Sequence, residues 1–150
     1  KLTALQRERL FAEITAKSLA FAIASASVEE IDKLNILQAS LLAMQRAVLQ
    51  LTIMPQMVLV DGNQIPRELN IPSQAIIGGD AKVAEISAAS ILAKVARDQV
   101  MLDLDKVYPN YGFAKHKGYG TKDHIAAINT YGVLNVHRRS FAPVRAVLDR

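Results

Sequence analysis

The chain has 150 residues, about one globular domain, and 51% of them are hydrophobic. No uncharged apolar run approaches the roughly 18 residues of a membrane span, and no secretory leader pattern opens the sequence. The absence of cysteine excludes disulfides, thiolate catalysis and Cys-based zinc sites. Together, these features lead us to expect a single domain in the cytoplasm.

The net charge of +4 is unevenly distributed. Residues 57–105 hold seven Asp and Glu against four Lys and Arg, whereas residues 106–150 hold two acidic residues, eight basic residues and all three histidines. An acidic centre followed by a basic end suits binding to a phosphate-bearing polymer. An ordinary solvated basic face would give the same count.

The first half of the chain predicts two helices with a strand between them. The capping box T-A-L-Q predicts a helix over residues 3–16, and S-V-E-E opens a second helix, over residues 28–51. Large and small residues alternate over residues 18–26, which predicts a strand closely covered on one face.

Two short apolar runs, each followed by an aspartate, predict the centre of a parallel sheet. M-V-L-V-D-G-N predicts a strand over 57–61, and Q-A-I-I-G-G-D predicts a strand over 74–78. In open α/β sheets, catalytic groups and ligands lie beyond the carboxyl ends of such strands. Asp61 and Asp80 are therefore candidate Mg²⁺ ligands. Two alternatives remain open: Asp61 opens an Asp-Gly turn, and Asp80 is placed to cap the next helix.

The second half of the chain predicts two further helices. A helix rich in small residues is expected over 83–106, and Thr121 and Gly132 mark the ends of a short helix. The order of elements predicts an α/β fold with a partly parallel sheet flanked by helices. We expect a single domain with its core over residues 1–106 and a basic substrate-binding segment over 107–150.

Two basic clusters are candidate nucleic-acid contacts. In K-H-K-G-Y-G-T, Tyr119 is placed to stack on a sugar or base while Lys115 and Lys117 hold phosphates. In H-R-R-S-F, Arg138 and Arg139 suit phosphate oxygens. The alternative for the first cluster is a surface turn whose tyrosine packs on the next helix.

Signatures of other enzyme classes are absent from the sequence. The histidines are 8 and 13 residues apart, unlike the pair of a zinc helix, and His124, in the first turn of a helix, is expected to be structural. Neither G-x-S-x-G nor the phosphate loop G-x-x-x-x-G-K-[ST] occurs. A small-molecule α/β enzyme is therefore disfavoured.

Five motifs taken together strongly resemble bacterial ribonuclease HII. They are V-L-V-D-G-N, I-I-G-G-D-A-K, E-I-S-A-A-S-I-L-A-K-V-A-R-D, Y-P-N-Y-G-F-A-K-H-K-G-Y-G-T and H-R-R-S-F-A-P-V. The resemblance covers essentially the whole chain and implies an RNase H-like α/β fold with Mg²⁺ or Mn²⁺ as cofactor. It also implies an endoribonuclease that hydrolyses the RNA strand of RNA–DNA hybrids. Such an enzyme nicks DNA 5′ of embedded ribonucleotides by a two-metal-ion mechanism.

The resemblance also implies roles for individual residues. Asp61 resembles the family's third active-site carboxylate, Asp80 its fourth, and Tyr119 the tyrosine that packs against the deoxyribose beside the ribonucleotide. Residues 1–3 resemble the end of the family's D-S-K-K-L-[ST] segment.

The family's D-E-A-G-R-G motif, which carries the first two carboxylates and reads the ribose 2′-hydroxyl, has no counterpart in this sequence. We therefore expect a C-terminal portion of such an enzyme, lacking its first strands and inactive or weakly active alone. Self-association through the sheet surface so exposed is a further expectation. The alternative is a non-catalytic nucleic-acid-binding fragment.

Overall fold

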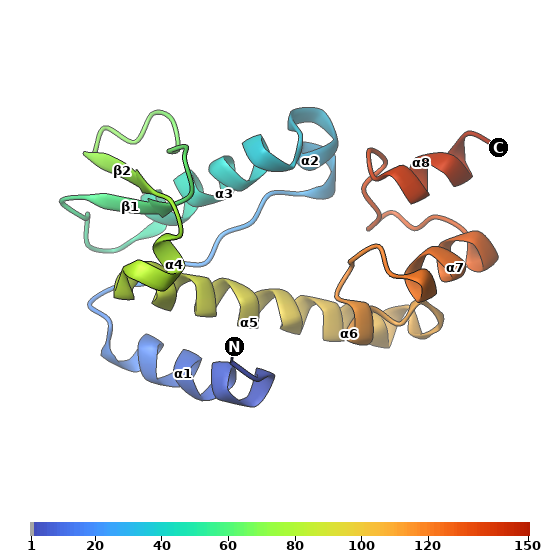
Figure 1. The fold of residues 1–150 in the computed structure, drawn as a ribbon, viewed down its shortest axis with the longest axis horizontal. Helices are drawn as coiled ribbons and strands as arrows, with labels where there is room; N and C mark the ends of the chain where they lie inside the picture. The colour runs from blue at the N-terminus through green and yellow to red at the C-terminus, as the bar shows by residue number, and fades with distance from the viewer. Residues whose placement is uncertain (1) are drawn as a thin grey trace. The chain divides into compact units, whose positions relative to one another are not determined.

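A computed structural model describes residues 2–150, and the described residues form eight α-helices, one 3₁₀ turn and two strands (Figure 1). Lys1 of the predicted N-terminal motif lies outside them. The chain divides into two compact units. Among the described residues, unit 1 comprises residues 2–26 and Leu37–Val95, and unit 2 comprises Ser27–Ile36 and Ala96–Arg150. The predicted division into a core over 1–106 and a segment over 107–150 stays a prediction.

The first helix of unit 1, α1, spans Ala4–Lys17 and confirms the predicted helix to within one residue at each end. The Gln6 N–H donates to the Thr3 hydroxyl, and the Thr3 N–H donates to the Gln6 side chain. This reciprocal capping box satisfies two donors that the first turn would otherwise leave without partners.

The sheet of unit 1 has two parallel strands, β1 (Val58–Asp61) and β2 (Ser73–Ile76), in register from Val58 opposite Ser73 to Asp61 opposite Ile76. Both predicted strands are confirmed, with β2 shifted toward the N-terminus. Helix α4 (Gly79–Lys82) follows β2, and the predicted long helix is α5 (Ala84–Val107).

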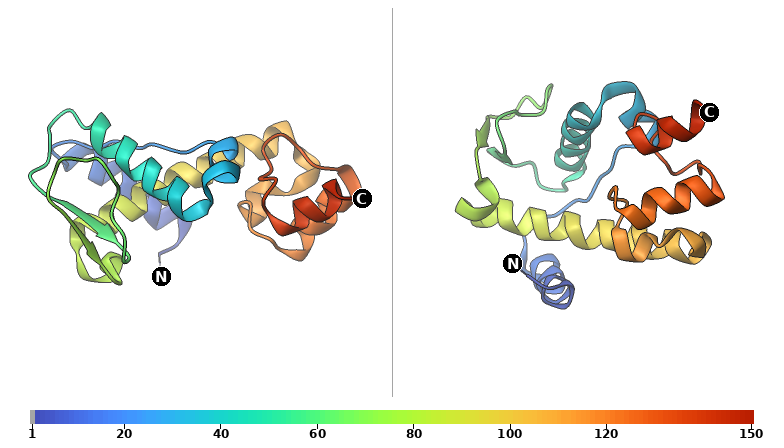
Figure 2. Two further views of the ribbon diagram at one scale, coloured as in Figure 1. Left: turned by 90° about the horizontal axis from the view of Figure 1, so that it is seen from above. Right: turned by 45° about the vertical axis from the view of Figure 1, so that its right-hand side comes forward.

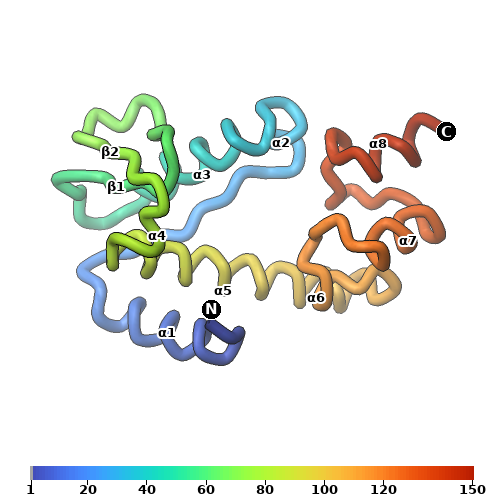
Figure 3. Tube along the Cα trace, viewed as in Figure 1, coloured from blue at the N-terminus to red at the C-terminus, as the bar shows by residue number. Residues whose placement is uncertain are grey.

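The strand predicted over residues 18–26 is wrong. The segment is extended, but among the described residues it has no ladder partner (Figure 3). Its exposure alternates as the residue sizes suggested: Phe21 and Ile23 are exposed, and Ala20, Ala22 and Ala24 are half-buried. The Ser25 carbonyl accepts a hydrogen bond from Arg46 of α3 (Ile36–Gln50) at 3.0 Å. The sequence pattern therefore identified the more buried face correctly, although the described residues give this segment no strand partner.

The single helix predicted over residues 28–51 is also wrong, because it is two helices, α2 (Val28–Leu34) and α3. Asn35 separates them with φ 81° and ψ 167°, a conformation that no helix can contain. Asparagine is one of the few non-glycine residues that adopt positive φ. The apolar spacing continues across the break, so periodicity alone could not reveal it.

Unit 2 contains a 3₁₀ turn, Pro109–Tyr111, and helices α6 (Phe113–His116), α7 (Lys122–Tyr131) and α8 (Ala142–Leu148). Helix α7 packs against the 3₁₀ turn, α6 and α8, and Figures 1 and 2 both place these helices side by side. Thr121 and Gly132 are its N- and C-caps, as predicted. A buried cluster holds the unit together and consists of Met101, Tyr111, Phe113 and Ala127.

Within the part of the chain that the structure describes, no helix combines the length and apolar character needed to cross a membrane.

Candidate metal and nucleic-acid sites

Asp61 is the last residue of β1 and its side chain is exposed, whereas the preceding Val60 is buried. Its Oδ1 accepts a hydrogen bond from the backbone N–H of Gly79 at 2.9 Å. The carboxylate at the end of one strand is thus bound to the backbone that follows the neighbouring strand.

Gly79 makes this approach possible because it has no side chain. A Cβ atom there would lie 2.7 Å from Cδ1 of Ile86 and 3.5 Å from Cα of Asp61, and the first distance is shorter than packed atoms tolerate. The next residue is Asp80, in the first turn of α4, which packs against β1. The structure therefore brings the two predicted carboxylate segments together in unit 1.

The two alternative interpretations of these aspartates have different outcomes. Asp80 is not a helix cap: the N-cap of α4 is Gly78, with φ 67°, and no side chain caps that helix. Asp61 is followed by Gly62 with φ 116°, so it does precede a turn. The turn explains the backbone conformation after Asp61. It does not explain why the Asp61 carboxylate accepts a hydrogen bond from Gly79.

The carboxylate oxygens of this pair are of the kind that a hard divalent cation prefers. Among residues 2–150, no group of three or more His, Asp or Glu side chains is arranged to hold a metal ion. Mg²⁺, however, is commonly bound through one or two carboxylates, its remaining ligands being waters and substrate phosphates. Asp61 and Asp80 are exposed, and one hydrogen bond from Gly79 leaves acceptor sites on a carboxylate. The donor set therefore suits Mg²⁺ or Mn²⁺ as a partial site.

Tyr119 lies in unit 2, between α6 and α7, and its side chain is 75% exposed. Its backbone is fixed at both polar atoms. The Tyr119 N–H donates to the His116 carbonyl at 3.0 Å, and its own carbonyl accepts from the Thr121 N–H at 2.9 Å and lies 2.8 Å from His124 Nδ1. A tyrosine packed on the next helix, as in the surface-turn alternative, would not be this exposed.

The four predicted phosphate contacts lie on two segments of unit 2. Lys115 lies 3.7 Å from the Asp123 carboxylate in a fully exposed ion pair, which is of little energetic weight. Lys117 follows α6 as its C-cap, with φ 56°, and is half-buried. Arg138 lies with its guanidinium 5.0 Å from the centre of the Phe141 ring. Arg139 is exposed beside it.

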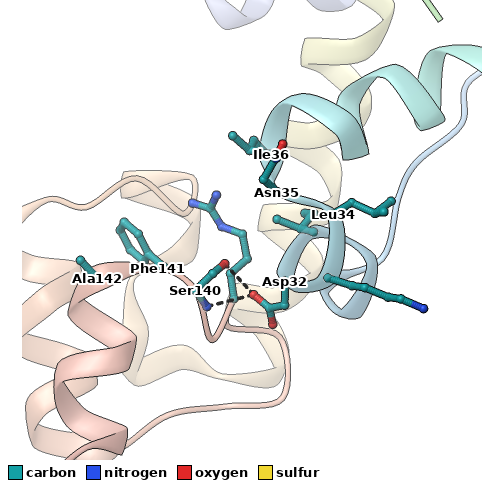
Figure 4. Close-up of a pocket in the computed structure, with 10 residues that line it drawn as sticks. Asp32, Leu34, Asn35, Ile36, Ser140, Phe141 and Ala142 are labelled. Atoms are coloured by element: carbon teal, nitrogen blue, oxygen red, sulfur yellow. Dashed lines mark hydrogen bonds between the residues drawn. The ribbon is translucent and has the colours of Figure 1, made fainter. Parts of the chain in front are cut away.

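Asp32 of α2 was missed by the sequence reasoning. Its Oδ2 accepts from the Arg139 N–H at 3.0 Å. Its Oδ1 accepts from the Ser140 N–H at 3.0 Å and from the Ser140 hydroxyl at 2.7 Å (Figure 4). These bonds fix the backbone that carries Arg138 and Arg139. They also form one wall of a pocket of about 430 Å³, lined by residues 31–36, Arg138 and residues 140–142.

These contacts also determine the acidity of Asp32. Burial alone raises the pKa of this carboxyl, but the hydrogen bonds from Ser140 and Arg139, together with the charge of Arg138, outweigh burial and lower the pKa below its ordinary value. No local signal marks Asp32, because it lies among the other charged residues of a short helix.

The fold is that of a ribonuclease H2. The structure superposes on the crystal structure of the ribonuclease H2 from Pyrococcus horikoshii with a TM-score of 0.85 and 24% sequence identity, covering 100% of this chain and 78% of that one. The predicted RNase H-like α/β fold is therefore confirmed.

The chain belongs to the ribonuclease HII family, whose family model matches residues 1–144. It is 62% identical over 149 residues to the ribonuclease HII of Acinetobacter baylyi, covering 99% of this chain and 79% of that protein. It is 64% identical over 142 residues to a ribonuclease HII of Methylibium petroleiphilum, covering 95% of this chain and 65% of that protein. It is 58% identical over 149 residues to the ribonuclease HII of Paracidovorax citrulli, covering 99% of this chain and 62% of that protein. It thus spans less than two thirds of the length of the last two.

Proposed function

We propose that the protein acts in the cytoplasm as a metal-dependent endoribonuclease. It hydrolyses the RNA strand of RNA–DNA hybrids and nicks DNA on the 5′ side of an embedded ribonucleotide. The observation that carries the proposal is the hydrogen bond from Gly79 to Asp61, in a chain of the ribonuclease HII family. It ties the carboxylate at the end of β1 to the backbone next to Asp80.

In this proposal Asp61 and Asp80 are the catalytic and metal-binding residues of the chain. Their oxygens hold Mg²⁺ or Mn²⁺, and the Gly79 N–H orients the Asp61 carboxylate. When bound there, the ions supply the chemistry of a two-metal site, which activates water and stabilises the leaving oxygen.

The nucleic acid is bound by unit 2. Lys115, Lys117, Arg138 and Arg139 contact backbone phosphates and contribute affinity without reading sequence. The exposed ring of Tyr119 packs against the deoxyribose beside the ribonucleotide. The 2′-hydroxyl is the group that distinguishes RNA from DNA at such a position.

A polypeptide of only these 150 residues is expected to be inactive or nearly so. Two carboxylates bind Mg²⁺ weakly, because the ion gives up its waters reluctantly unless carboxylates and phosphate converge on it. Robust turnover by this polypeptide would contradict that expectation.

The metal site can be tested without turnover. Mn²⁺ is paramagnetic, so its titration into the ¹⁵N-labelled chain is expected to broaden the amide signals of Asp61, Gly79 and Asp80 first. Asp61→Asn and Asp80→Asn should each reduce this broadening, whereas Asp98→Asn, on α5, serves as the charge-matched control. Broadening that ignores both substitutions would contradict the proposed ligands.

A second candidate function is non-catalytic nucleic-acid binding, favoured by the small number of carboxylates at the end of β1. A DNA duplex carrying one ribonucleotide separates the two functions, provided that the protein tested carries the family's D-E-A-G-R-G segment ahead of residues 1–150. A divalent-dependent nick 5′ of the ribonucleotide, abolished by Asp61→Asn, supports the endonuclease. Salt-dependent binding without any nick supports the binding fragment.

A further inference from the structure

Three histidines that are far apart in the sequence meet in unit 2. His116 ends α6, His124 lies in α7, and His137 precedes α8; their exposed fractions are 6%, 2% and 5%. The rings of His116 and His124 are stacked with centroids 3.9 Å apart, and Nε2 of His124 lies 3.2 Å from Nε2 of His137. Phe113 packs edge-on against His116 and His124.

Backbone donors determine which nitrogens carry protons. The Gly118 N–H donates to His116 Nδ1 at 3.0 Å, and the Leu134 N–H donates to His137 Nδ1 at 2.9 Å. A backbone N–H can only donate, so both Nδ1 atoms are unprotonated acceptors and each of these two rings carries its proton on Nε2.

The donor and the acceptor in each remaining hydrogen bond of the three rings then follow. His137 Nε2–H donates to His124 Nε2, so His124 carries its proton on Nδ1 and donates it to the Tyr119 carbonyl, 2.8 Å away. His116 Nε2–H donates to the Tyr111 carbonyl at 2.7 Å. All six ring nitrogens have a partner when all three rings are neutral.

We infer that this histidine cluster positions Tyr119 for contact with nucleic acid, and that His124 is the positioning residue that acts on it directly. The inference rests on the proposed role of Tyr119. His116 holds the backbone on the other side, through its carbonyl to the Tyr119 N–H and through its ring to the Gly118 N–H. Gly118 has φ 86°, so the chain turns sharply just before the tyrosine.

The physical gain is preorganisation. Ordering a mobile loop on binding costs conformational entropy, which subtracts from affinity. Because the Tyr119 backbone is already fixed by buried groups, only rotation of its side chain remains to be lost when it packs on a sugar. A histidine cluster with a purely structural role would support all binding by unit 2 equally.

Two substitutions of His124 separate these roles. An asparagine amide lies close to the position of Nδ1, so His124→Asn keeps a donor for the Tyr119 carbonyl. A glutamine amide reaches the position of Nε2, so His124→Gln loses that donor while remaining polar and of similar size.

The measurement is the affinity for a labelled DNA duplex carrying one ribonucleotide, relative to the same duplex made of DNA alone. Tyr119→Ala is expected to reduce this preference by roughly tenfold, in line with the loss of one aromatic contact. His124→Gln is expected to reduce it similarly, and His124→Asn much less. The double variant His124→Gln/Tyr119→Ala should be no worse than either single variant, because the two residues act through one contact.

Several outcomes would overturn the inference. Equal loss of affinity for both duplexes, additive effects in the double variant, or a folded His124→Asn as impaired as His124→Gln would each indicate a structural role. If Tyr119→Ala leaves the preference unchanged, the proposed role of Tyr119 itself fails.

A spectroscopic test does not depend on any variant folding. At pH 7, ¹⁵N spectra of the imidazoles are expected to show Nε2–H tautomers for His116 and His137 and the Nδ1–H tautomer for His124. An Nε2–H tautomer at His124 leaves Nδ1 without a proton, so it would remove the bond to the Tyr119 carbonyl and contradict the proposal.

Discussion

At the scale of single residues, Gly79 packs tightly next to the proposed metal ligands of unit 1. Gly79 is buried between Ile86 and the end of β1, and its N–H holds Asp61. A substitution of Gly79 tests whether the segments that carry Asp61 and Asp80 can lie this close only because residue 79 has no side chain.

Gly79→Ala is expected to lower the free energy of unfolding by about 1–3 kcal/mol, because its Cβ would overlap Cδ1 of Ile86. Ile86→Val removes that atom, so the same glycine substitution should cost less in the Ile86→Val background. Urea unfolding of all four proteins gives the coupling between the two sites. An equal cost in both backgrounds would show that the strain lies elsewhere.

The histidine cluster predicts a loss of stability in mild acid. Burial, with smaller contributions from the charges of His124 and His116, lowers the pKa of His137 to about 4 from an ordinary 6.5. Burial likewise lowers the pKa of His124. Tyr111 also faces the cluster, and burial raises the pKa of its phenol, so it stays neutral in acid.

Between about pH 4 and pH 6.5, the unfolded chain therefore binds more protons than the folded chain. The stabilisation is complete above pH 6.5 and is lost as the pH falls toward 4, by roughly 3 kcal/mol for His137. Denaturant unfolding at several pH values measures the slope. His137→Asn should flatten it, and an unchanged slope in that variant would contradict the assignment.

The candidate site was predictable where the signal is local in sequence. An apolar run ending in aspartate was enough to select Asp61 and Asp80, and the structure joins their segments through Gly79. Asp32 and the histidine cluster were not predictable, because their partners come from other elements. The spacings of 8 and 13 residues between the histidines do not follow a helical repeat, because His116 lies on α6, His124 on α7 and His137 in the segment before α8.

At the scale of elements, capping residues were the reliable predictors. Thr3, Ser27 and Thr121 each begin a helix, and each side chain accepts a backbone N–H from the first turn. Periodicity was less reliable, since it did not reveal the break at Asn35. A strand requires a hydrogen-bonded neighbour, so alternation over residues 18–26 could predict an extended chain but not a partner for it.

The contact between α2 and the segment before α8 depends on one side chain. Asp32→Asn removes the charge and replaces one acceptor oxygen with a donor, so the bonds to Arg139 and Ser140 cannot all form. We expect a loss of about 1–2 kcal/mol in the free energy of unfolding. Glu29→Gln, an exposed charge change on the same helix, is the control. Equal effects of the two substitutions would contradict the role given to Asp32.

At the scale of the whole molecule, the extended segment of residues 18–26 makes self-association an expected property. Its large side chains remain exposed: Leu19 by 90%, Phe21 by 46% and Ile23 by 41%. An extended backbone with no ladder partner among the described residues is a template for pairing with another chain.

We therefore expect sedimentation of the 150-residue chain to show association that increases with concentration. Ile23→Lys should shift it toward the monomer, because a charge on an extended edge opposes pairing. Val107→Lys, at an exposed apolar residue of α5, should leave it unchanged. A monomer at all concentrations would contradict self-association of the 150-residue chain.

The hydrogen bonds of Asp32 also constrain the order in which the two units can fold during synthesis. Asp32 and Ser140 are separated by 108 positions, and the intervening chain includes the sheet and most of unit 1. Loop closure costs about 0.6 kcal/mol more for each doubling of loop length, and contacts between distant residues form slowly. During synthesis, α2 leaves the ribosome long before its partner exists. Unit 1 can therefore begin to fold while the ribosome is still translating, whereas unit 2 has to wait until Ser140 has emerged.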